Sequence, residues 1–193
     1  MPPSSPSVPS ELIDLLEQNA LQRGQFTLAS GKQASYYLDC RQITLHPKGA
    51  ALIGHSMLDS IQSTADETGV TPDAVGGMAI GADPITASIV TVAGLRDLAL
   101  FGFMVRKEPK GHGTGKQVEG PVKPGQKVVI VEDVITSGGS ALKAVEAARA
   151  FGLEVLYVLA IIDRLAGGQE AFAKQGLELK TLMTVRDFGI EPE

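Results

Sequence analysis

From residue 73 onward, the sequence alternates short apolar runs with stretches of helical periodicity. The apolar runs are AVGGMAI, LALFGFMV, KVVIVEDVI, EVLYVLAIID and LELKTLMTV. Helical patterns follow several of these runs, namely PITASIVTVAG, GGSALKAVEAARAFG and AGGQEAFAKQG. Strands that are apolar on both faces and separated by helices are typical of a parallel sheet covered by helices on both sides. The alternation therefore predicts an α/β fold with a central parallel sheet flanked by helices.

The segment before this alternation predicts a small N-terminal hood. Ser10 is a candidate N-cap for a helix over ELIDLLEQNAL, and a further helix is expected after Pro47. Between them, FTLAS and SYYLDCR are predicted as two short strands joined by a turn at residues 30–32. We predict a flexible tail over residues 1–9 and a single domain over residues 10–193. About residues 10–45 and the C-terminal segment form the hood in this prediction.

Composition limits the classes of protein that fit such a chain. Its 193 residues, 44% of them hydrophobic, suffice for one α/β domain, and its opening residues lack the features of a secretory signal. No run is long and apolar enough to span a bilayer, and the net charge of −5 argues against broad nucleic-acid binding. The only cysteine, Cys40, is predicted as a small apolar strand residue, which permits a cytoplasmic location.

The segment VVIVEDVITSGGSALKAV, residues 128–145, predicts a phosphate site. Residues 128–131 form a continuous apolar run, as expected of a central parallel strand, and a helical stripe begins at Ala141. Ligands of such sheets bind beyond the carboxyl ends of the strands. The loop there offers small side chains, hydroxyl groups and backbone amides at a helix start, from Thr136, Ser137, Gly138, Gly139 and Ser140. Amides and the helix macrodipole attract an anion, and glycine allows close approach.

Two acids, Glu132 and Asp133, precede this loop. Carboxylates would repel a phosphate directly, so sugar hydroxyls or a metal-bound water are the better partners. A phosphate beside a diol describes ribose 5-phosphate. A nucleotide triphosphatase is disfavoured because GHGTGKQ does not fit the spacing of a P-loop. An ordinary acidic strand-to-helix turn with glycine caps remains an alternative at this point.

A second anion site is expected in the loop RKEPKGHGTGK, residues 106–116. Its cations outnumber its single acid, Glu108, in an otherwise acidic chain. The cations are Arg106, Lys107, Lys110 and Lys116. The three glycines of the loop suggest mobility.

The segment EDVITSGGS resembles the phosphoribosyl pyrophosphate motif of type I phosphoribosyltransferases, two acids followed by a Thr/Ser/Gly loop. Three further segments, FTLASGKQASYYLDCR, RKEPKGHGTGKQVEG and IIDRLAGG, resemble the orotate phosphoribosyltransferases of that family. The resemblance covers nearly the whole chain after the tail. It implies the type I phosphoribosyltransferase fold and the transfer of ribose 5-phosphate from phosphoribosyl pyrophosphate to orotate, in pyrimidine biosynthesis.

The family resemblance also implies roles for individual residues. Lys110, His112 and Asp133 would be catalytic. Phosphoribosyl pyrophosphate would contact Arg106, Lys107, Lys110, His112, Glu132, Asp133, Val134, Ile135, Thr136, Ser137, Gly138, Gly139 and Ser140. Orotate would contact Thr136 and Arg164, and the backbone around Tyr36 and Tyr37 would line the base pocket. A guanidinium at Arg164 suits this base because it can pair with the orotate carboxylate through two parallel hydrogen bonds.

By the same resemblance the enzyme uses Mg²⁺, held mostly by the substrate's own oxygens and by water, with no direct protein ligand named. A homodimer is implied, in which the 106–116 loop reaches the active site of the neighbouring subunit. No protein nucleophile is needed, because the orotate ring nitrogen displaces pyrophosphate at the anomeric carbon. Catalysis would come from positioning and from charge stabilisation of the leaving group.

The chain also departs from the family pattern. Some members carry lysines at the positions of Ala29 and Gly81, and Lys32 is a weak candidate to replace them. The segment GMAIGADP, residues 77–84, still resembles the family's pyrophosphate loop, and close backbone approach would explain its glycines.

Several alternatives stay open from the sequence. Arg164 could be a surface arginine paired with Asp163, His112 an exposed loop histidine, and the loop lysines a solvated face. The substrate could be a purine or another base. A non-catalytic regulator that senses phosphoribosyl pyrophosphate is the alternative from another functional class.

Overall fold

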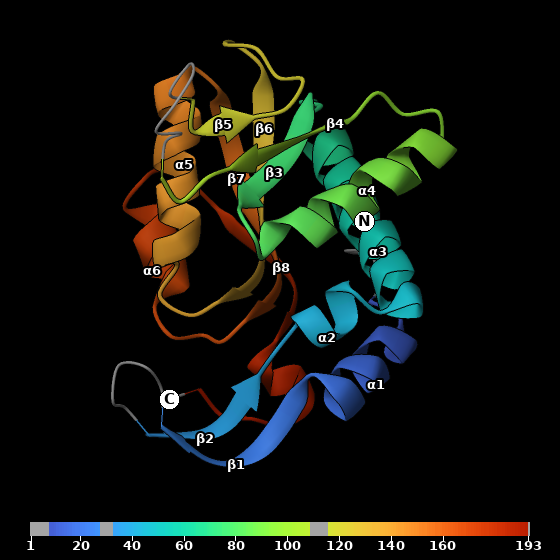
Figure 1. Cartoon of the computed structure of the whole chain (residues 1–193), viewed down its shortest axis with the longest axis vertical. Coiled ribbons are helices and arrows are strands. Elements are labelled where there is room, and N and C mark those ends of the chain that lie inside the picture. The colour runs from blue at the N-terminus through green and yellow to red at the C-terminus, as the bar shows by residue number, and fades with distance from the viewer. Residues whose placement is uncertain (1–7, 28–32, 109–115, 193) are drawn as a thin grey trace.

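A computed structural model of the chain describes residues 8–27, 33–108 and 116–192. Its centre is a six-stranded sheet with the strand order β5-β4-β3-β6-β7-β8 (Figure 1). The strands are β3 (Ala74–Met78), β4 (Phe101–Val105), β5 (Val118–Glu119), β6 (Lys127–Ile135), β7 (Glu154–Asp163) and β8 (Leu179–Thr184). All neighbouring pairs are parallel except β4 and β5. The predicted α/β fold with a central parallel sheet is thus confirmed.

The antiparallel strand β5 was not predicted. It has only two residues, Val118 paired with Val105 and Glu119 paired with Met104. A strand this short has no readable periodicity, and it directly follows the glycine-rich loop. It closes the sheet at the β4 edge.

Helices cover both faces of the sheet, as predicted. On one face lie α3 (Pro47–Thr68) and α4 (Ala82–Leu95), and on the other lie α5 (Gly139–Phe151) and α6 (Gly168–Ala173) (Figure 1). Strand β6 alternates between them: Val129 and Val131 belong to the core under α3 and α4. Val128 and Ile130 belong to the core under α5 and α6. This explains why β6 is apolar on both faces.

A small hood lies at one end of the sheet, at the bottom of Figure 1. It contains α1 (Ser10–Asn19), the antiparallel pair β1 (Leu21–Thr27) and β2 (Gln33–Leu38), and α2 (Arg41–Thr44). The C-terminal 3-10 turn η1 (Val185–Phe188) joins it, because Arg23 Nη2 donates a hydrogen bond to the Phe188 carbonyl at 2.8 Å. Leu12 and Leu16 of α1 are fully buried in the same core as Val185 and Phe188. The hood is therefore built from both ends of the chain.

Local predictions near the hood need correction. Ser10 is the first helical residue of α1 and not its N-cap, which is Pro9, and no side chain caps this helix. The helix ends at Asn19, and the predicted second strand ends at Leu38. Cys40 is buried as expected, but it lies in the turn before α2 and not in a strand. Four polar or β-branched residues form α2, too few for a recognisable period.

Pro47 does begin a helix. It occupies the first turn of α3, where its missing N–H costs nothing, and the His46 ring accepts a hydrogen bond from the Gly49 N–H at 3.2 Å. In the described part of the chain, no helix combines the length and the apolar character needed to cross a membrane.

Candidate active site

The carboxyl ends of four adjacent strands meet at one edge of the sheet. Met78 of β3 pairs with Val105 of β4, and Ile135 of β6 pairs with Asp163 of β7. The segments that follow these strands therefore lie along the same edge. They begin at residues 79, 106, 136 and 164, which are the segments where the sequence predicts ligand contacts.

The segment 136–140 forms an open cradle at the start of α5. Gly138, the N-cap residue, has φ +80°, and its carbonyl accepts the Leu142 N–H at 2.9 Å. Thr136, Ser137, Gly139 and Ser140 are exposed. No side chain among the described residues caps α5, so its first amides have no side-chain acceptor there. A hollow of about 200 Å³ lies here, lined by Glu132, Val134, Ile135, Thr136, Ser137, Gly138, Gly139, Ser140 and Ala141.

Gly138 is required by the protein itself as well as by any ligand. A Cβ atom at this position would lie 2.9 Å from the ring of Phe172, a fully buried residue of α6. Gly139 differs, because the nearest atom to its added Cβ would be the Ser137 Oγ at 4.0 Å. The first glycine therefore fixes the loop against α6, and the second leaves open space on the side of the hollow.

Glu132 is a buried acid with an unpaired oxygen. Its side chain is 5% exposed, and its Oε2 has no hydrogen-bond partner among the described residues. Its Oε1 accepts the Asp133 N–H at 3.3 Å, and Asp133 Oδ1 accepts the Val134 N–H at 2.7 Å. Burial, followed by the charge of Asp133, raises the pKa of Glu132 to about 8. An orphaned acceptor beside a hollow marks a place for a donor from a ligand.

The glycines of the segment 77–84 have different causes. A Cβ at Gly77 would lie 2.2 Å from the Val131 carbonyl of β6, so close packing inside the sheet requires this glycine. Gly81 has helical φ and ψ, and its Cβ would lie 3.5 Å from Glu132 Oε1 and 3.8 Å from Asp133 Oδ1. The close approach of the neighbouring strand β6, and not of a ligand, thus explains the glycine at position 77. No such approach explains the glycine at position 81. A side chain at position 81 would point at the acid pair.

Arg164 lies beside the cradle. Its backbone N–H donates to the Ile135 carbonyl at 2.8 Å, directly before Thr136. Its Nε donates to the Tyr36 hydroxyl at 2.7 Å, and its Cζ lies 4.4 Å from the centroid of the Tyr36 ring. Asp163 instead accepts the Leu165 N–H at 2.8 Å. The alternative pairing of Arg164 with Asp163 therefore has no support in the described contacts.

Tyr36 and Tyr37 point to opposite faces of the hood hairpin, because successive strand residues alternate. Tyr36 is buried against Arg164, whereas Tyr37 is 39% exposed and its ring centroid lies 5.9 Å from that of Phe26. The structure therefore brings Tyr36, Arg164 and Thr136 to one place. The Tyr37 side chain lies on the other face, and the prediction for this residue concerned its backbone.

The basic loop is described only at its two ends. Arg106, Lys107 and Lys116 are exposed. Arg106 Nε donates to Glu119 Oε1 of β5 at 3.1 Å, so an acid outside residues 106–116 pairs with one of the loop cations. Lys110 and His112 lie outside the described residues, as do Ala29 and Lys32.

The acid pair fits a magnesium ion that arrives with its own ligands. Among the described residues, no group of three or more His, Cys, Asp or Glu side chains could hold a metal. Two adjacent carboxylates, one with an unpaired oxygen, supply the hard oxygen donors that Mg²⁺ prefers, but too few for a cage made of protein alone.

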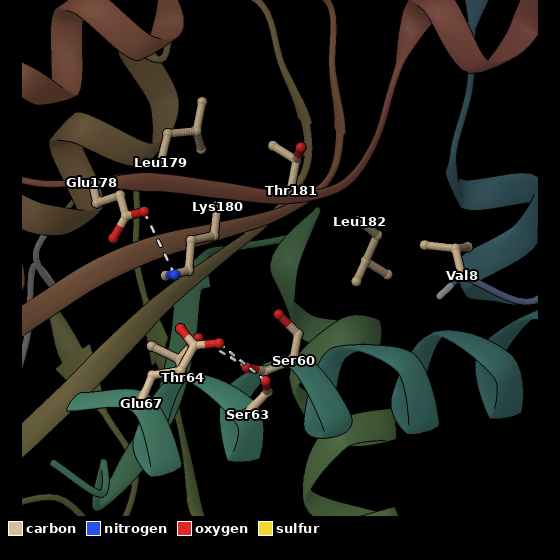
Figure 2. Close-up of a pocket in the computed structure, with 10 residues that line it drawn as sticks. All are labelled: Val8, Ser60, Ser63, Thr64, Glu67, Glu178, Leu179, Lys180, Thr181 and Leu182. Atoms are coloured by element: carbon tan, nitrogen blue, oxygen red, sulfur yellow. Dashed lines mark hydrogen bonds and ion pairs between the residues drawn. The ribbon is translucent and has the colours of Figure 1, made fainter. Parts of the chain in front are cut away.

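Another hollow, of about 300 Å³, lies between α3 and β8, away from this edge (Figure 2). Its polar side chains contact one another: Lys180 Nζ lies 3.5 Å from Glu178 Oε1, and Ser63 Oγ donates to Glu67 Oε1 at 3.4 Å. None of the predicted site residues lines it. Its greater volume is no reason to place the chemistry there.

Three features of the site were not predicted from the sequence: the Tyr36 hydroxyl on Arg164, the Phe172 ring against Gly138, and Glu119 on Arg106. The first two join segments that are far apart in the chain, and the third joins β5 to the residue that follows β4. Only the first had a signal, since a tyrosine hydroxyl in a buried strand needs a partner.

Comparisons with known proteins agree with this geometry. A family model described as the phosphoribosyl transferase domain matches residues 40–183. The chain is 78% identical to an orotate phosphoribosyltransferase of Rhodopirellula baltica, over 94% of each chain. It is 45% identical to one from Aquifex aeolicus, over 84% of this chain and 85% of the relative. Among solved structures, it is similar to the Mycobacterium tuberculosis orotate phosphoribosyltransferase in complex with phosphoribosyl pyrophosphate. That match has a TM-score of 0.75 and 35% identity, covering 94% of this chain and 98% of the other.

Proposed function

Because this chain belongs to the orotate phosphoribosyltransferases of the type I phosphoribosyltransferase family, we propose that it transfers ribose 5-phosphate from phosphoribosyl pyrophosphate to orotate. The products are orotidine 5′-phosphate and pyrophosphate, in pyrimidine biosynthesis. The observation that carries the proposal is the position of Arg164: its backbone N–H donates to the Ile135 carbonyl directly before the phosphate cradle, and its guanidinium is held by Tyr36 of the hood. A site with an anion cradle, an acid pair and a guanidinium in this order suits a sugar phosphate and an acidic base.

In this proposal the cradle holds the 5′-phosphate and the acid pair holds the ribose diol. The first amides of α5 and the hydroxyls of residues 136, 137 and 140 donate to the phosphate oxygens. The unpaired Glu132 Oε2 accepts a hydrogen bond from a ribose hydroxyl, which gives this buried oxygen a partner. Asp133, less buried, accepts from the neighbouring hydroxyl. The backbone of residues 134 and 135 completes the wall.

At the base end, Arg164 pairs with the orotate carboxylate and Thr136 with the ring. A guanidinium presents parallel N–H groups that match a carboxylate, and a neutral purine would gain much less from it. The backbone of residues 36 and 37 of β2 forms the hood side of this pocket, while the Tyr36 side chain lies on Arg164. The exposure of the Tyr37 ring on the other face is consistent with a backbone role for residue 37.

The reaction we propose is a displacement at the anomeric carbon. The orotate ring nitrogen forms the new C–N bond and loses its proton to the departing pyrophosphate or to water, and the C–O bond to pyrophosphate breaks with its electron pair on the departing oxygen. Arg106, Lys107, Lys110 and His112 stabilise the charge of this leaving group. Arg106 must exchange its ion pair with Glu119 for the pyrophosphate. That exchange costs little, since an exposed pair contributes about 0–1 kcal/mol.

We propose Mg²⁺ as the cofactor and a homodimer as the working form. The ion would neutralise charge on the pyrophosphate oxygens, with Asp133 near it through water. In the dimer, the 106–116 loop of one subunit would reach the site of its partner. The division into a tail over residues 1–9 and a domain over 10–193, and the cytoplasmic location, stay predictions from the sequence.

A substrate screen tests the proposed function. The purified chain is mixed with phosphoribosyl pyrophosphate and MgCl₂, and orotate, uracil, adenine or hypoxanthine is added in turn. We expect turnover with orotate and far less turnover with the other bases. The change in the ultraviolet absorbance of orotate monitors its consumption. Turnover of a purine at a rate similar to that of orotate would contradict the assignment of the base. Binding of phosphoribosyl pyrophosphate without turnover of any base would favour a regulator.

A further inference from the structure

We infer that Tyr36 is a positioning residue for Arg164, and that its hydroxyl fixes the guanidinium so that its terminal nitrogens face the carboxylate of the base. The inference rests on the proposed function, because it assumes that Arg164 binds orotate. It adds a second residue to base recognition, one that acts on the arginine and not on the substrate.

Two contacts from one side chain hold the guanidinium. The Tyr36 hydroxyl accepts the Arg164 Nε–H at 2.7 Å, and the Tyr36 ring lies 4.4 Å from the guanidinium carbon. The ring contact fixes the plane of the guanidinium, and the hydrogen bond fixes its rotation within that plane. Arginine side chains otherwise have several rotatable bonds, which binding must freeze.

The hydrogen bond also selects which edge of Arg164 meets the ligand. Because Nε already donates to Tyr36, the side edge formed by Nε and one terminal nitrogen cannot bind a carboxylate through two parallel hydrogen bonds. The end formed by Nη1 and Nη2 remains, and neither atom has a partner among the described residues. An end-on pair of N–H donors suits a planar carboxylate at the edge of a pyrimidine ring.

Packing alone does not explain a tyrosine at this position. Tyr36 is 3% exposed, and a phenylalanine would fill the same space without the cost of burying a hydroxyl. Arg164 is its recorded side-chain partner, from a residue 128 positions away. The hydroxyl is therefore best explained by its hydrogen bond to Arg164. Through this bond, the hood positions a side chain at the edge of the sheet.

The test compares Tyr36→Phe with Tyr157→Phe in the full chain. Both variants remove a buried tyrosine hydroxyl, but Tyr157 lies in the core between β7 and α3 and has no contact with Arg164. We expect Tyr36→Phe to raise the orotate KM roughly tenfold, because it removes the one hydrogen bond that holds the charged guanidinium of Arg164 in place. The KM for phosphoribosyl pyrophosphate should stay within about twofold, and Tyr157→Phe should change neither KM.

Coupling to Arg164 separates positioning from general damage. In an Arg164→Ala background, Tyr36→Phe should have no further effect on the orotate KM, because the group that it positions is gone. If Tyr36→Phe raises the KM values of both substrates equally, or has its full effect without Arg164, the inference is wrong. If Arg164→Ala raises the orotate KM and Tyr36→Phe does not, the inference fails and the proposed function stands. If neither variant changes it, the base site itself is misplaced.

A measurement on the unmodified protein covers the case in which Tyr36→Phe does not fold. The Nε–H of Arg164, assigned by its loss in Arg164→Lys, should give a slowly exchanging NMR signal in the ligand-free chain. Fast exchange with water at this atom would contradict the inference. The hydrogen bond to a buried hydroxyl is what protects it.

Discussion

The two ends of the candidate site are built in different ways. The phosphate end is a single stretch, residues 132–140, in which one strand, one loop and one helix start supply the contacts proposed for the ribose 5-phosphate. The base end joins Tyr36 of the hood to Arg164 at the edge of the sheet. The first is therefore set by local folding, and the second exists only when the hood is docked. Substitutions at the phosphate end should therefore change mainly the KM for phosphoribosyl pyrophosphate, and substitutions at the base end mainly the KM for orotate.

The docking of the hood depends mainly on burial. Leu12 and Leu16 of α1 are fully buried beside Phe188. The ion pair of Arg23 with Glu17 is half exposed on both sides and contributes little. The base end thus draws its stability from apolar contacts that lie some distance from the ligand. The phosphate end draws it from the sheet itself.

The largest effect is expected from Arg164→Ala. Removal of the guanidinium leaves the orotate carboxylate without its charged partner, which costs about 3 kcal/mol, or roughly a hundredfold in the orotate KM. The KM for phosphoribosyl pyrophosphate should change little. Steady-state kinetics with each substrate varied in turn measures both values. An unchanged orotate KM would remove Arg164 from the base end.

A pH experiment on Glu132 tests the phosphate end. Its pKa is about 8 in the folded chain and near 4.5 ordinarily, so between these pH values the folded state keeps a proton that the unfolded chain has lost. The free energy of unfolding of the ligand-free protein should therefore fall as pH rises from about 5 to about 8, with Glu132 contributing a few kcal/mol, at about 1.4 kcal/mol per pH unit. Glu132→Gln should remove this part of the fall. Thermal unfolding of both proteins across this pH range measures it, and equal falls would contradict the buried state of Glu132.

The glycine that fixes the cradle should affect stability. Gly138→Ala places a side chain at φ +80° and 2.9 Å from the Phe172 ring, which should lower the free energy of unfolding by roughly 1–2 kcal/mol. Denaturant unfolding measures this loss. Gly139→Ala is the matched control, because its added methyl group meets no protein atom closer than 4.0 Å. Similar losses in the two variants would show that Phe172 does not limit the loop.

Gly139→Ala should instead weaken the binding of phosphoribosyl pyrophosphate. Gly139 lines the hollow at the start of α5, where the 5′-phosphate is proposed to lie, and its added methyl group meets no close protein atom. We expect the KM for phosphoribosyl pyrophosphate to rise roughly tenfold, about 1.4 kcal/mol, with little change in the orotate KM. Kinetics at saturating orotate measures it. If only the orotate KM rises, the two ends have been assigned in reverse.

The same contrast explains what the sequence could predict. The parallel sheet, its helices and the cradle at 136–140 follow from short-range patterns, because strand, loop and helix are consecutive at β6 and α5. The acids at 132 and 133 could be located for the same reason. Their order along the chain is their order in space.

Contacts between distant segments could not be predicted in this way. The hydroxyl of Tyr36 on Arg164 and the ring of Phe172 on Gly138 depend on how the hood and α6 pack, which no local period encodes. The family resemblance named residues 36 and 164 separately, without their contact. The close backbone approach predicted for the glycines of residues 77–84 does not explain Gly81, where an added Cβ would lie 3.5 Å from Glu132 Oε1.

The central claim is that residues 132–140 bind the sugar phosphate independently of the base end. Titration calorimetry of phosphoribosyl pyrophosphate with MgCl₂, in the absence of orotate, tests it most directly. We predict one binding site per chain, weakened roughly tenfold by Gly139→Ala and left nearly unchanged by Arg164→Ala. No uptake by the unmodified chain, or an equal loss in both variants, would contradict the claim.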